Sequence, residues 1–281
     1  MDISEFTARR RTLTTASGDI AYTESGAGPA AVFVHGLATS GALWRHVIER
    51  VDRTTRCIAV DLPLHGGTAP REDPSVTAMA QLIADLCRGL GLDRIDLVGN
   101  DTGGVVAQIV AATHPELLRS LVLTNCDTEG NFPPPAFTPV IQAAARGEIA
   151  PLLTTAAVNP AAARMSPLAT GYEHPDQVPD EVWREYLVPI GQTIERARLF
   201  ERMLIALDPA ELETVTPGLR HLDLPVLLVW GTAEEALGTE WAYRLRDLIP
   251  GARVEIDGGK LFFPEERPEK LAVQLRRHWA R

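Results

Sequence analysis

Apolar segments alternate with amphipathic ones along the first half of the chain, and this alternation most constrains how the chain folds. The apolar segments occupy residues 31–34, 56–60, 95–98 and 121–123. Short continuous apolar runs are typical of strands buried on both faces of a parallel sheet. Between them, apolar residues recur at the spacing of a helix in residues 43–51, 79–90 and 105–112. Strands that alternate with helices predict right-handed crossovers and a doubly wound, mostly parallel α/β sheet.

The remaining segments divide the chain into a sheet-forming core and an insertion. Residues 11–15 and 20–24 predict an antiparallel hairpin at the edge of the sheet. Between residues 127 and 224 we find only helical patches, at residues 139–145, 181–190 and 194–207. The α/β pattern resumes at residues 225–230, 240–248, 254–256 and 267–279. We therefore predict an α/β core, residues 1–126 and 225–281, with an all-helical cap, residues 127–224, inserted after the sixth strand.

The composition is that of an ordinary globular protein without a covalent or metal staple. Of the 281 residues, 45% are hydrophobic and 23% are charged, and a domain of this length buries roughly three quarters of its unfolded surface. The three cysteines form no CxxC pair, and the chain has no HExxH or Walker A motif. We therefore expect no metal, nucleotide or other cofactor.

Charge and hydropathy restrict the partners of the chain. The 27 basic and 37 acidic residues give a net charge of −10, which argues against a nucleic-acid partner. No apolar run approaches the ~18 residues of a membrane span, and the first residues lack the apolar stretch of a signal peptide. We expect a cytoplasmic monomer or homodimer that binds a small molecule and no membrane.

The sequence from Gly99 to Gly104, GNDTGG, follows an apolar segment directly and precedes a helical one. It fits the pattern G-x-nucleophile-x-G, with Asp101 at the nucleophile position. Glycines on both sides permit a sharp, strained turn that lifts one side chain above the edge of the sheet. The helix that follows offers backbone N–H groups to an anion. Taken alone, the motif also fits an aspartate that caps an ordinary helix.

Three further turns occur in the order that a known family requires. His35-Gly36 follows one apolar segment, Asp61-Leu62-Pro63 follows the next, and Gly231-Thr232-Ala233-Glu234 follows the segment after the cap. Together with the turn at Asp101, these motifs resemble the α/β-hydrolase fold. The aspartate at the turn resembles the haloalkane dehalogenase and epoxide hydrolase branch of that superfamily. The resemblance covers nearly the whole chain outside the cap.

The resemblance implies roles for individual residues. Asp101 matches the nucleophile that attacks carbon and forms an ester intermediate. The backbone N–H groups of Leu37 and Thr102 match the donors of the oxyanion hole. Glu234 and Asp127 occupy the two places where the family carries an acidic triad member. His35, like His65, matches a turn position that we interpret as mainly structural.

The sequence departs from the family at the catalytic histidine. Aligning on Glu266-Arg267-Pro268 places Leu261 at the histidine position, and no histidine occurs between residues 222 and 277. Since that histidine activates the water that cleaves the ester, the ester should accumulate without it. One route is a hydrolase of dehalogenase or epoxide hydrolase type in which Glu234 or Asp127 replaces the base.

Two alternatives remain open at this stage. In one, Asp101 acts as a general acid or base, its pKa raised by burial, in a cofactor-free lyase, isomerase or cyclase. In the other, the degenerate triad leaves a pseudoenzyme that only binds its ligand. A shared fold fixes the place of the pocket and not its chemistry.

Substrate clues come from the turn and the cap. Dehalogenases of this branch commonly carry Trp and Asn where this chain has Thr102 and Leu37, so halide release is disfavoured. Epoxide hydrolases of the branch protonate the epoxide oxygen with two cap tyrosines, and Tyr172 and Tyr186 are the only tyrosines of the cap, where both could simply pack. The candidate pocket residues are His35, Tyr172, Tyr186, Trp183, Leu261 and Phe262. We expect a small to medium, neutral and partly apolar ligand.

Overall fold

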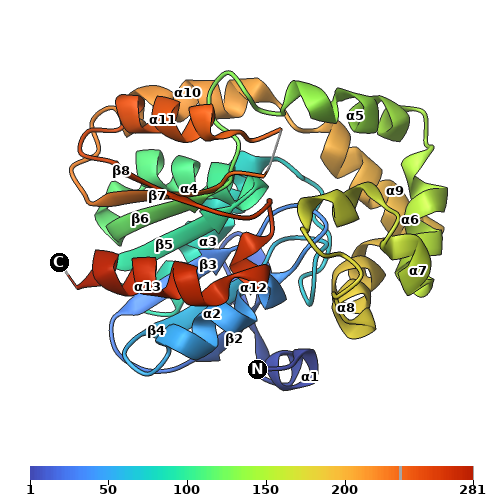
Figure 1. Ribbon diagram of the computed structural model, residues 1–281, viewed down its shortest axis with the longest axis horizontal. Coiled ribbons are helices and arrows are strands. Elements are labelled where there is room, and N and C mark those ends of the chain that lie inside the picture. The colour runs from blue at the N-terminus through green and yellow to red at the C-terminus, as the bar shows by residue number, and fades with distance from the viewer. Residues whose placement is uncertain (234–235, 281) are drawn as a thin grey trace.

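A computed structural model describes residues 1–233 and 236–280, which form one eight-stranded sheet covered by helices and extended by a helical insertion (Figure 1). The strands are β1 (Arg10–Thr15), β2 (Gly18–Ser25), β3 (Ala30–Val34), β4 (Arg56–Asp61), β5 (Ile95–Asn100), β6 (Leu118–Thr124), β7 (Val226–Gly231) and β8 (Arg253–Asp257). Their order across the sheet is β1-β2-β4-β3-β5-β6-β7-β8. β1 and β2 pair antiparallel, β2 pairs antiparallel with β4, and every later pair is parallel. The predicted fold class and edge hairpin are confirmed.

Helices cover both faces of the sheet. The core helices are α1 (Ile3–Ala8), α2 (Arg45–Val51), α3 (Val76–Gly89), α4 (Thr102–Thr113), α11 (Thr239–Leu248), α12 (Phe263–Glu266) and α13 (Pro268–Trp279). Helices α2 and α13 pack together on one face, whereas α3 and α4 pack together on the other (Figure 1). All six residues of β5, whose sequence is IDLVGN, are buried between these layers, which explains why apolar residues and glycine occupy four of its positions.

The segment between β6 and β7 contains helices and no strand. Its helices are α5 (Thr138–Ala145), α6 (Ile149–Val158), α7 (Pro160–Ala163), α8 (Asp180–Gly191), α9 (Ile194–Ile205) and α10 (Pro209–Leu219). Short 3-10 helices lie at Gly41–Trp44, Pro115–Leu117, Pro135–Phe137 and Pro167–Gly171. The three predicted patches correspond to α5, α8 and α9, but α6 and α10 were not predicted. Helix α10 packs on the core helix α4, where a Cβ on Gly218 would lie 3.0 Å from that of Ala112.

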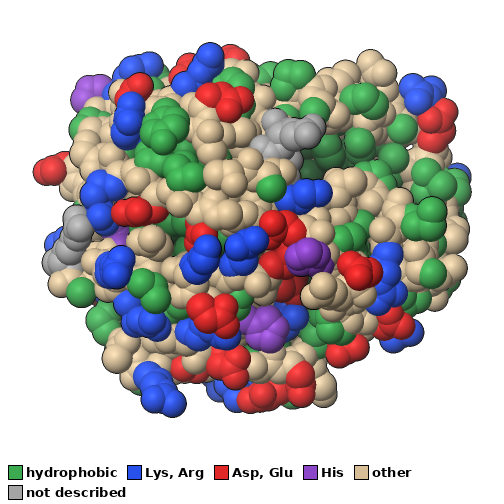
Figure 2. Space-filling model, viewed as in Figure 1, with side chains coloured by type: hydrophobic (Ala, Val, Ile, Leu, Met, Phe, Trp, Pro, Cys, Tyr) green, Lys and Arg blue, Asp and Glu red, His purple; other side chains and the backbone are tan. Residues whose placement is uncertain are grey.

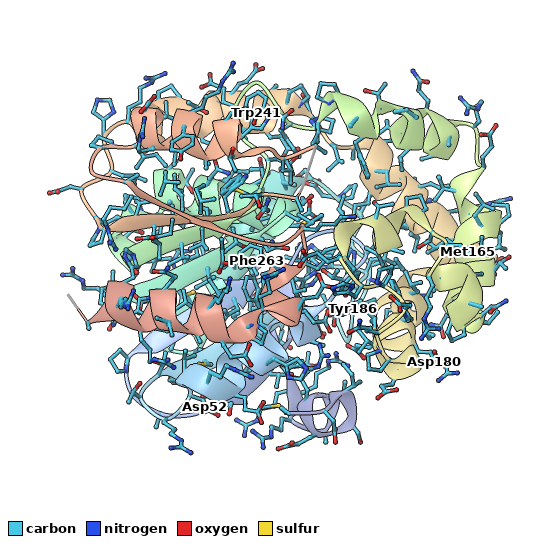
Figure 3. The ribbon with its side chains drawn as sticks, in the orientation of Figure 1. Asp52, Met165, Asp180, Tyr186, Trp241 and Phe263 are labelled. Carbon is cyan, nitrogen blue, oxygen red and sulfur yellow. The ribbon has the colours of Figure 1, made fainter. Side chains whose placement is uncertain are left out.

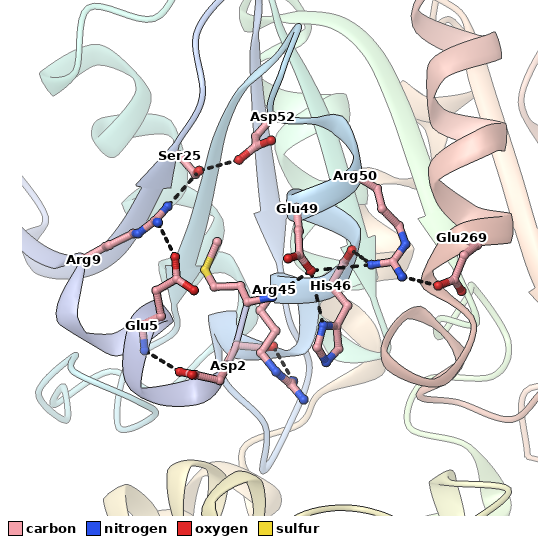
Figure 4. Close-up of polar contacts among 12 residues, drawn as sticks. Asp2, Glu5, Arg9, Ser25, Arg45, His46, Glu49, Arg50, Asp52 and Glu269 are labelled. Atoms are coloured by element: carbon pink, nitrogen blue, oxygen red, sulfur yellow. Dashed lines mark hydrogen bonds and ion pairs between the residues drawn. The ribbon is translucent and has the colours of Figure 1, made fainter.

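Polar contacts fasten α1 and α2 to neighbouring elements (Figure 4). Arg9 donates to Ser25, which donates to Asp52 at the end of α2. Arg50 of α2 forms an ion pair with Glu269 of α13. The contacts of Ser25 are partly buried, whereas the ion pair of Arg50 and Glu269 is exposed and adds little free energy. The surface is hollowed where the core meets the cap, and hydrophobic side chains line that hollow (Figure 2).

Candidate active site

Asp101 joins β5 to α4 in a strained backbone conformation, with φ of 55° and ψ of −134°. A positive φ is uncommon for a residue other than glycine and costs free energy. Backbone hydrogen bonds hold the turn on both sides. The Asp101 N–H donates to the Asn125 carbonyl at 3.0 Å, and the Asp101 carbonyl accepts from the Gly104 N–H at 2.8 Å. The predicted sharp turn between strand and helix is thus present in the structure.

Three glycines let neighbouring backbones reach this turn. A Cβ on Gly99 would lie 2.5 Å from the Gly103 carbonyl oxygen, and one on Gly103 would lie 2.2 Å from the His35 carbonyl oxygen. A Cβ on Gly104 would lie 2.2 Å from the Cβ of Cys126. Because backbone cannot yield as a flexible side chain can, these positions require glycine for steric reasons.

The carboxylate of Asp101 accepts a hydrogen bond from a second loop. The Leu37 N–H, just after β3, donates to Asp101 Oδ2 at 3.0 Å. A Cβ on Gly36 would lie 2.1 Å from the same oxygen, so glycine is also needed here. Thr102 is the first residue of α4, where backbone N–H groups have no partner within the helix. Leu37 therefore contacts the Asp101 carboxylate, Thr102 adjoins Asp101 in the chain, and both Asp101 and Leu37 are only partly buried.

Asp127 lies in the segment that follows β6 and packs against the turn. Its side chain is 3% exposed, and its Oδ1 has no hydrogen-bond partner among the residues that the structure describes. The Gln108 amide, from α4, donates to the Asp127 carbonyl at 2.8 Å and to the Gly104 carbonyl at 3.1 Å. Burial, and then the charge of Asp101, raise the pKa of Asp127 well above its usual value. The carboxyl group of Asp127 is therefore harder to ionise than that of an ordinary aspartic acid.

His35 and His65 are fully buried and spend both ring nitrogens on backbone groups. Nε2 of His35 accepts from the Leu62 N–H at 2.9 Å, so Nδ1 carries the proton and faces the Gly36 carbonyl at 2.7 Å. In the same way, Nε2 of His65 accepts from the Ala38 N–H at 3.0 Å. Burial lowers the pKa of His35 to about 4 and that of His65 to about 3. Both rings are neutral and shape the loops around the turn.

His221 lies near the amino-terminal ends of the central strands, whereas Asp101 lies at the carboxyl end of β5. It follows α10, and its Nδ1 faces the Pro217 carbonyl at 2.9 Å. It lines a groove with Arg94 and Leu118, which stand at the beginnings of β5 and β6. A strand of six residues spans roughly 20 Å. The length of the sheet therefore separates this histidine from the turn after β5.

The segment after β8 reaches the residue that precedes Asp101. The Asn100 side-chain amide donates to the Leu261 carbonyl at 3.0 Å. The Phe262 N–H donates to the Gly171 carbonyl of the cap at 3.0 Å. Leu261 is partly buried, and Phe262 is fully buried. Leu261, where we expect the histidine of the family, thus has its backbone beside the turn.

The cap tyrosines are engaged by a buried carboxylate that sequence reasoning did not single out. Tyr172 and Tyr186 donate their hydroxyl protons to Glu265 Oε2 at 2.6 and 2.9 Å, and Arg45 forms an ion pair with Oε1. Burial, and then the charge of Glu265, raise the pKa of both tyrosines well above the usual value. Figure 3 labels Tyr186 on α8, where the cap meets the core. The hydroxyls are therefore used to bind the cap to α12 and α2.

The other two predicted pocket residues of the cap interface pack around this network. The ring of Tyr172 lies 5.5 Å from that of Trp183 and 4.8 Å from that of Phe262. All three side chains are at least nine-tenths buried. The sequence signal for the cluster was the glutamate Glu265, which directly follows the apolar Phe-Phe-Pro segment.

Glu234, the other candidate acid, lies outside the described residues. Among the residues that the structure does describe, no group of three or more His, Cys, Asp and Glu side chains is arranged to hold a metal ion. Within the same part of the chain, every helix is too short or too polar to cross a membrane.

Residues 31–274 match the model of the Alpha/beta hydrolase family. The chain belongs to this family. The expected fold is thereby confirmed, and with it the α/β-hydrolase superfamily of enzymes.

Relatives and solved structures agree on the fold. Haloalkane dehalogenase 2 from Mycobacterium tuberculosis is 27% identical over 281 residues, covering 92% of this chain and 90% of that protein. Epoxide hydrolase 1 from Caenorhabditis elegans is 23% identical, covering 89% and 64%. Haloalkane dehalogenase DbeA from Bradyrhizobium elkani superposes with a TM-score of 0.79 at 21% identity, covering 95% of each chain. An enol-lactonase from Burkholderia xenovorans gives 0.78 at 17% identity, covering 96% and 100%.

The close contact at Gly103 generates a prediction about stability. We expect Gly103→Ala to lower the free energy of unfolding by about 1–3 kcal/mol, since its methyl group overlaps a backbone carbonyl. Gly258→Ala is the matched control, because its Cβ would meet only the end of the Arg267 side chain, at 3.3 Å. Urea denaturation followed by circular dichroism measures both. Equal stabilities for the two variants would contradict the close packing of the turn.

The network around Glu265 generates a second prediction. Glu265→Gln preserves the size of the side chain but leaves Arg45 buried without a countercharge, so we expect a loss of about 3–5 kcal/mol. The double variant Glu265→Gln, Arg45→Met should lose less than the sum of the two single variants. Urea denaturation of all four proteins completes the cycle. Additive losses would show that the two charges do not interact.

Proposed function

We propose that this protein hydrolyses a small, neutral, partly apolar electrophile of the epoxide or alkyl halide class through an ester on Asp101. In this proposal, a carboxylate takes the place of the histidine base. The observation that carries it is the hydrogen bond from the Leu37 N–H to Oδ2 of Asp101, at a strained turn between a buried strand and a helix. The cytoplasm remains our expectation for its location.

The hydrogen bond at Oδ2 supports both halves of such a reaction. In the first half, one carboxylate oxygen attacks carbon while the other keeps the Leu37 N–H. In the second half, that oxygen is the ester carbonyl, and it gains negative charge when water adds to Cγ. A fixed N–H aimed at this oxygen stabilises the charge as it develops. The N–H of Thr102, the first residue of α4, is proposed as the second donor for the same task.

The choice of electrophile follows from the turn and from the relatives. Relatives named haloalkane dehalogenase and epoxide hydrolase both match along most of this chain. Thr102 and Leu37 lack the side-chain N–H groups that hold a leaving halide in the first class, which favours the second. The two cap tyrosines, however, donate to Glu265. Another group must therefore supply the proton for an epoxide oxygen.

The base is proposed to be Glu234 or Asp127. His35 and His65 are neutral, and both ring nitrogens of each are hydrogen-bonded to backbone groups. His221 lies near the amino-terminal ends of β5 and β6, away from Asp101. General base catalysis requires a group within hydrogen-bond reach of the attacking water, directly or through one further water. Of the two carboxyl groups, Asp127 is near enough for the charge of Asp101 to raise its pKa.

A second candidate function is favoured by the neighbouring carboxyl groups of Asp101 and Asp127, of which Asp127 has a raised pKa. A carboxylate and a carboxylic acid side by side can remove a proton from one atom of a substrate and deliver one to another. Such a pair would serve a cofactor-free lyase, isomerase or cyclase in which Asp101 never bonds to carbon. This alternative predicts turnover without any covalent intermediate.

Isotope labelling in heavy-oxygen water tests the ester on Asp101. The wild-type protein turning over an epoxide should place the label in the carboxylate of Asp101, because water attacks Cγ and not the substrate carbon. The tryptic peptide of residues 95–119 contains Asp101, and mass spectrometry of that peptide measures the label. Asp101→Asn should lose turnover, with circular dichroism confirming that it folds. Turnover without label would favour the non-hydrolytic function, and no adduct, label or turnover would leave a binding protein.

Restoring the missing group gives a further prediction. We expect Leu261→His to raise steady-state hydrolysis of the ester, since the Leu261 carbonyl already contacts the residue before Asp101. The gain should be small, under about tenfold, because a histidine also needs an acid to orient it. Release of product after a single burst of alkylation measures the effect, and Leu261→Asn is the control. A slower release in Leu261→His than in Leu261→Asn would contradict the proposed position.

A further inference from the structure

We propose that Asp127 is the second catalytic carboxyl group of this site, first as the acid that protonates an epoxide oxygen and then as the base that activates water. This inference rests on the proposed ester at Asp101 and narrows its substrate class to epoxides. It assigns to one side chain the two tasks that the cap tyrosines and a histidine perform in the epoxide hydrolases that the chain resembles.

Packing fixes Asp127 to the same turn that holds Asp101. The Asn125 carbonyl, two residues before Asp127, accepts the Asp101 N–H at 3.0 Å. Cys126 fills the space that only a glycine at position 104 leaves open. The Gln108 amide of α4 then holds the Asp127 carbonyl at 2.8 Å. The two carboxyl groups thus stand on segments that are joined by direct hydrogen bonds. These hydrogen bonds oppose movement of one segment relative to the other.

The side chain of Asp127 is not explained by a structural role. It is 3% exposed, yet Oδ1 has no hydrogen-bond partner within the described part of the chain. A buried carboxylate without compensation is costly, and a protonated carboxyl costs far less. The groups that face it are Asp101 and the thiol of Cys126, whose own pKa is raised well above its usual value by burial. No cation compensates it among the described residues.

The proton of this pair rests on Asp127. Asp101 accepts the Leu37 N–H and stands at the N-terminus of α4, and both features favour its ionised form. Asp127 is buried, and the charge of Asp101 opposes its ionisation. Two carboxyl groups that share one proton in different surroundings divide into a nucleophile and an acid.

The first step balances with this proton alone. An oxygen of the Asp101 carboxylate attacks an epoxide carbon, and the bond between that carbon and the ring oxygen breaks. The ring oxygen takes the proton of Asp127 and becomes a hydroxyl group. The products are a neutral hydroxyalkyl ester of Asp101 and an ionised Asp127.

The second step returns both groups to their initial state. Asp127, now a base, takes a proton from water as the water oxygen adds to Cγ of the ester. The intermediate collapses, the bond from carbonyl carbon to alkoxide oxygen breaks, and the alkoxide takes the proton of the new Asp101 carboxyl group. A diol leaves, with Asp101 ionised and Asp127 protonated. Because the ester is neutral, the ionised Asp127 faces no like charge during this step.

An alkyl halide would not complete this cycle in the same way. A halide leaves as an anion and takes no proton, so Asp127 would still carry its proton when the ester has formed. Two probes of equal chain length, 1,2-epoxyhexane and 1-bromohexane, therefore separate the need for an acid from the need for the nucleophile. The rate of adduct formation on Asp101 is measured by intact mass and mapped to residues 95–119, apart from Cys126 and Asp127 in residues 120–146.

Asp127→Asn keeps the size of the side chain and removes the transferable proton. We expect it to slow adduct formation with 1,2-epoxyhexane by about 100-fold or more, and to change the rate with 1-bromohexane by less than about threefold. Glu129→Gln, an exposed substitution two residues further along the same loop, is the control and should change neither rate. An equal loss with both probes, or no loss with the epoxide, would overturn the role of Asp127 and leave the ester on Asp101 standing.

The wild-type protein provides a second test that needs no variant. Since Asp127 must be protonated to act as an acid, adduct formation with 1,2-epoxyhexane should fall as the pH rises through the pKa of Asp127. The reaction with 1-bromohexane needs only the ionised Asp101 and should not fall over that range. Parallel pH profiles would overturn the inference. If the wild type forms no adduct with either probe, the proposed function itself fails, which is a different outcome.

Discussion

Three backbone segments approach one another closely at Asp101 because glycines stand at the contact points, and the geometry of the whole site depends on this contact. The carboxyl ends of β3, β5 and β6 converge there because these strands are parallel neighbours. Gly103 lets α4 approach the His35 carbonyl, and Gly104 lets it approach Cys126. This arrangement requires a positive φ at Asp101, which costs free energy, and it directs the carboxylate toward the Leu37 N–H. Removing any one of these close approaches would separate the carboxylate from its donor.

Much of the fold could be predicted from the sequence, because the core strands and the turn at Asp101 obey local rules. Each central strand is rich in apolar residues, and the turn combines glycines with a strand before it and a helix after it. Helix α10 escaped prediction because Pro217 and Gly218 lie within it, and local propensity disfavours both. Its packing on α4 overrides that propensity. Helix α6 is rich in Ala and Thr and lacks a clear polar face, so its period gave no signal.

The candidate site could be predicted where its parts are adjacent in the sequence and not where distant segments combine. Asp101, Thr102 and the loop at Leu37 follow from motifs that each occupy a few residues. Glu265, in contrast, gathers partners that lie 79, 93 and 220 residues away along the chain. No local pattern reveals that Tyr172 and Tyr186 would donate to it. These contacts can be predicted only when it is known which helices the cap packs against, and in this protein they are α2 and α12.

Glu265 at the cap interface and Asp127 at the turn are both buried, but their hydrogen bonding differs and indicates different roles. Glu265 uses both oxygens, one for Arg45 and one for the tyrosine hydroxyls, so its charge is compensated and its position is fixed. Asp127 leaves Oδ1 without a partner in the described residues and stands next to a second acid. A carboxyl group that served only packing would be replaced at lower free energy by an apolar or amide side chain. Departures from full hydrogen bonding are expected where a group must exchange protons, because a proton that is fully engaged by a permanent acceptor cannot be transferred. Asp127, whose Oδ1 has no partner in the described residues and whose segment is hydrogen-bonded to Asp101, is therefore the side chain on which the proposed reaction rests.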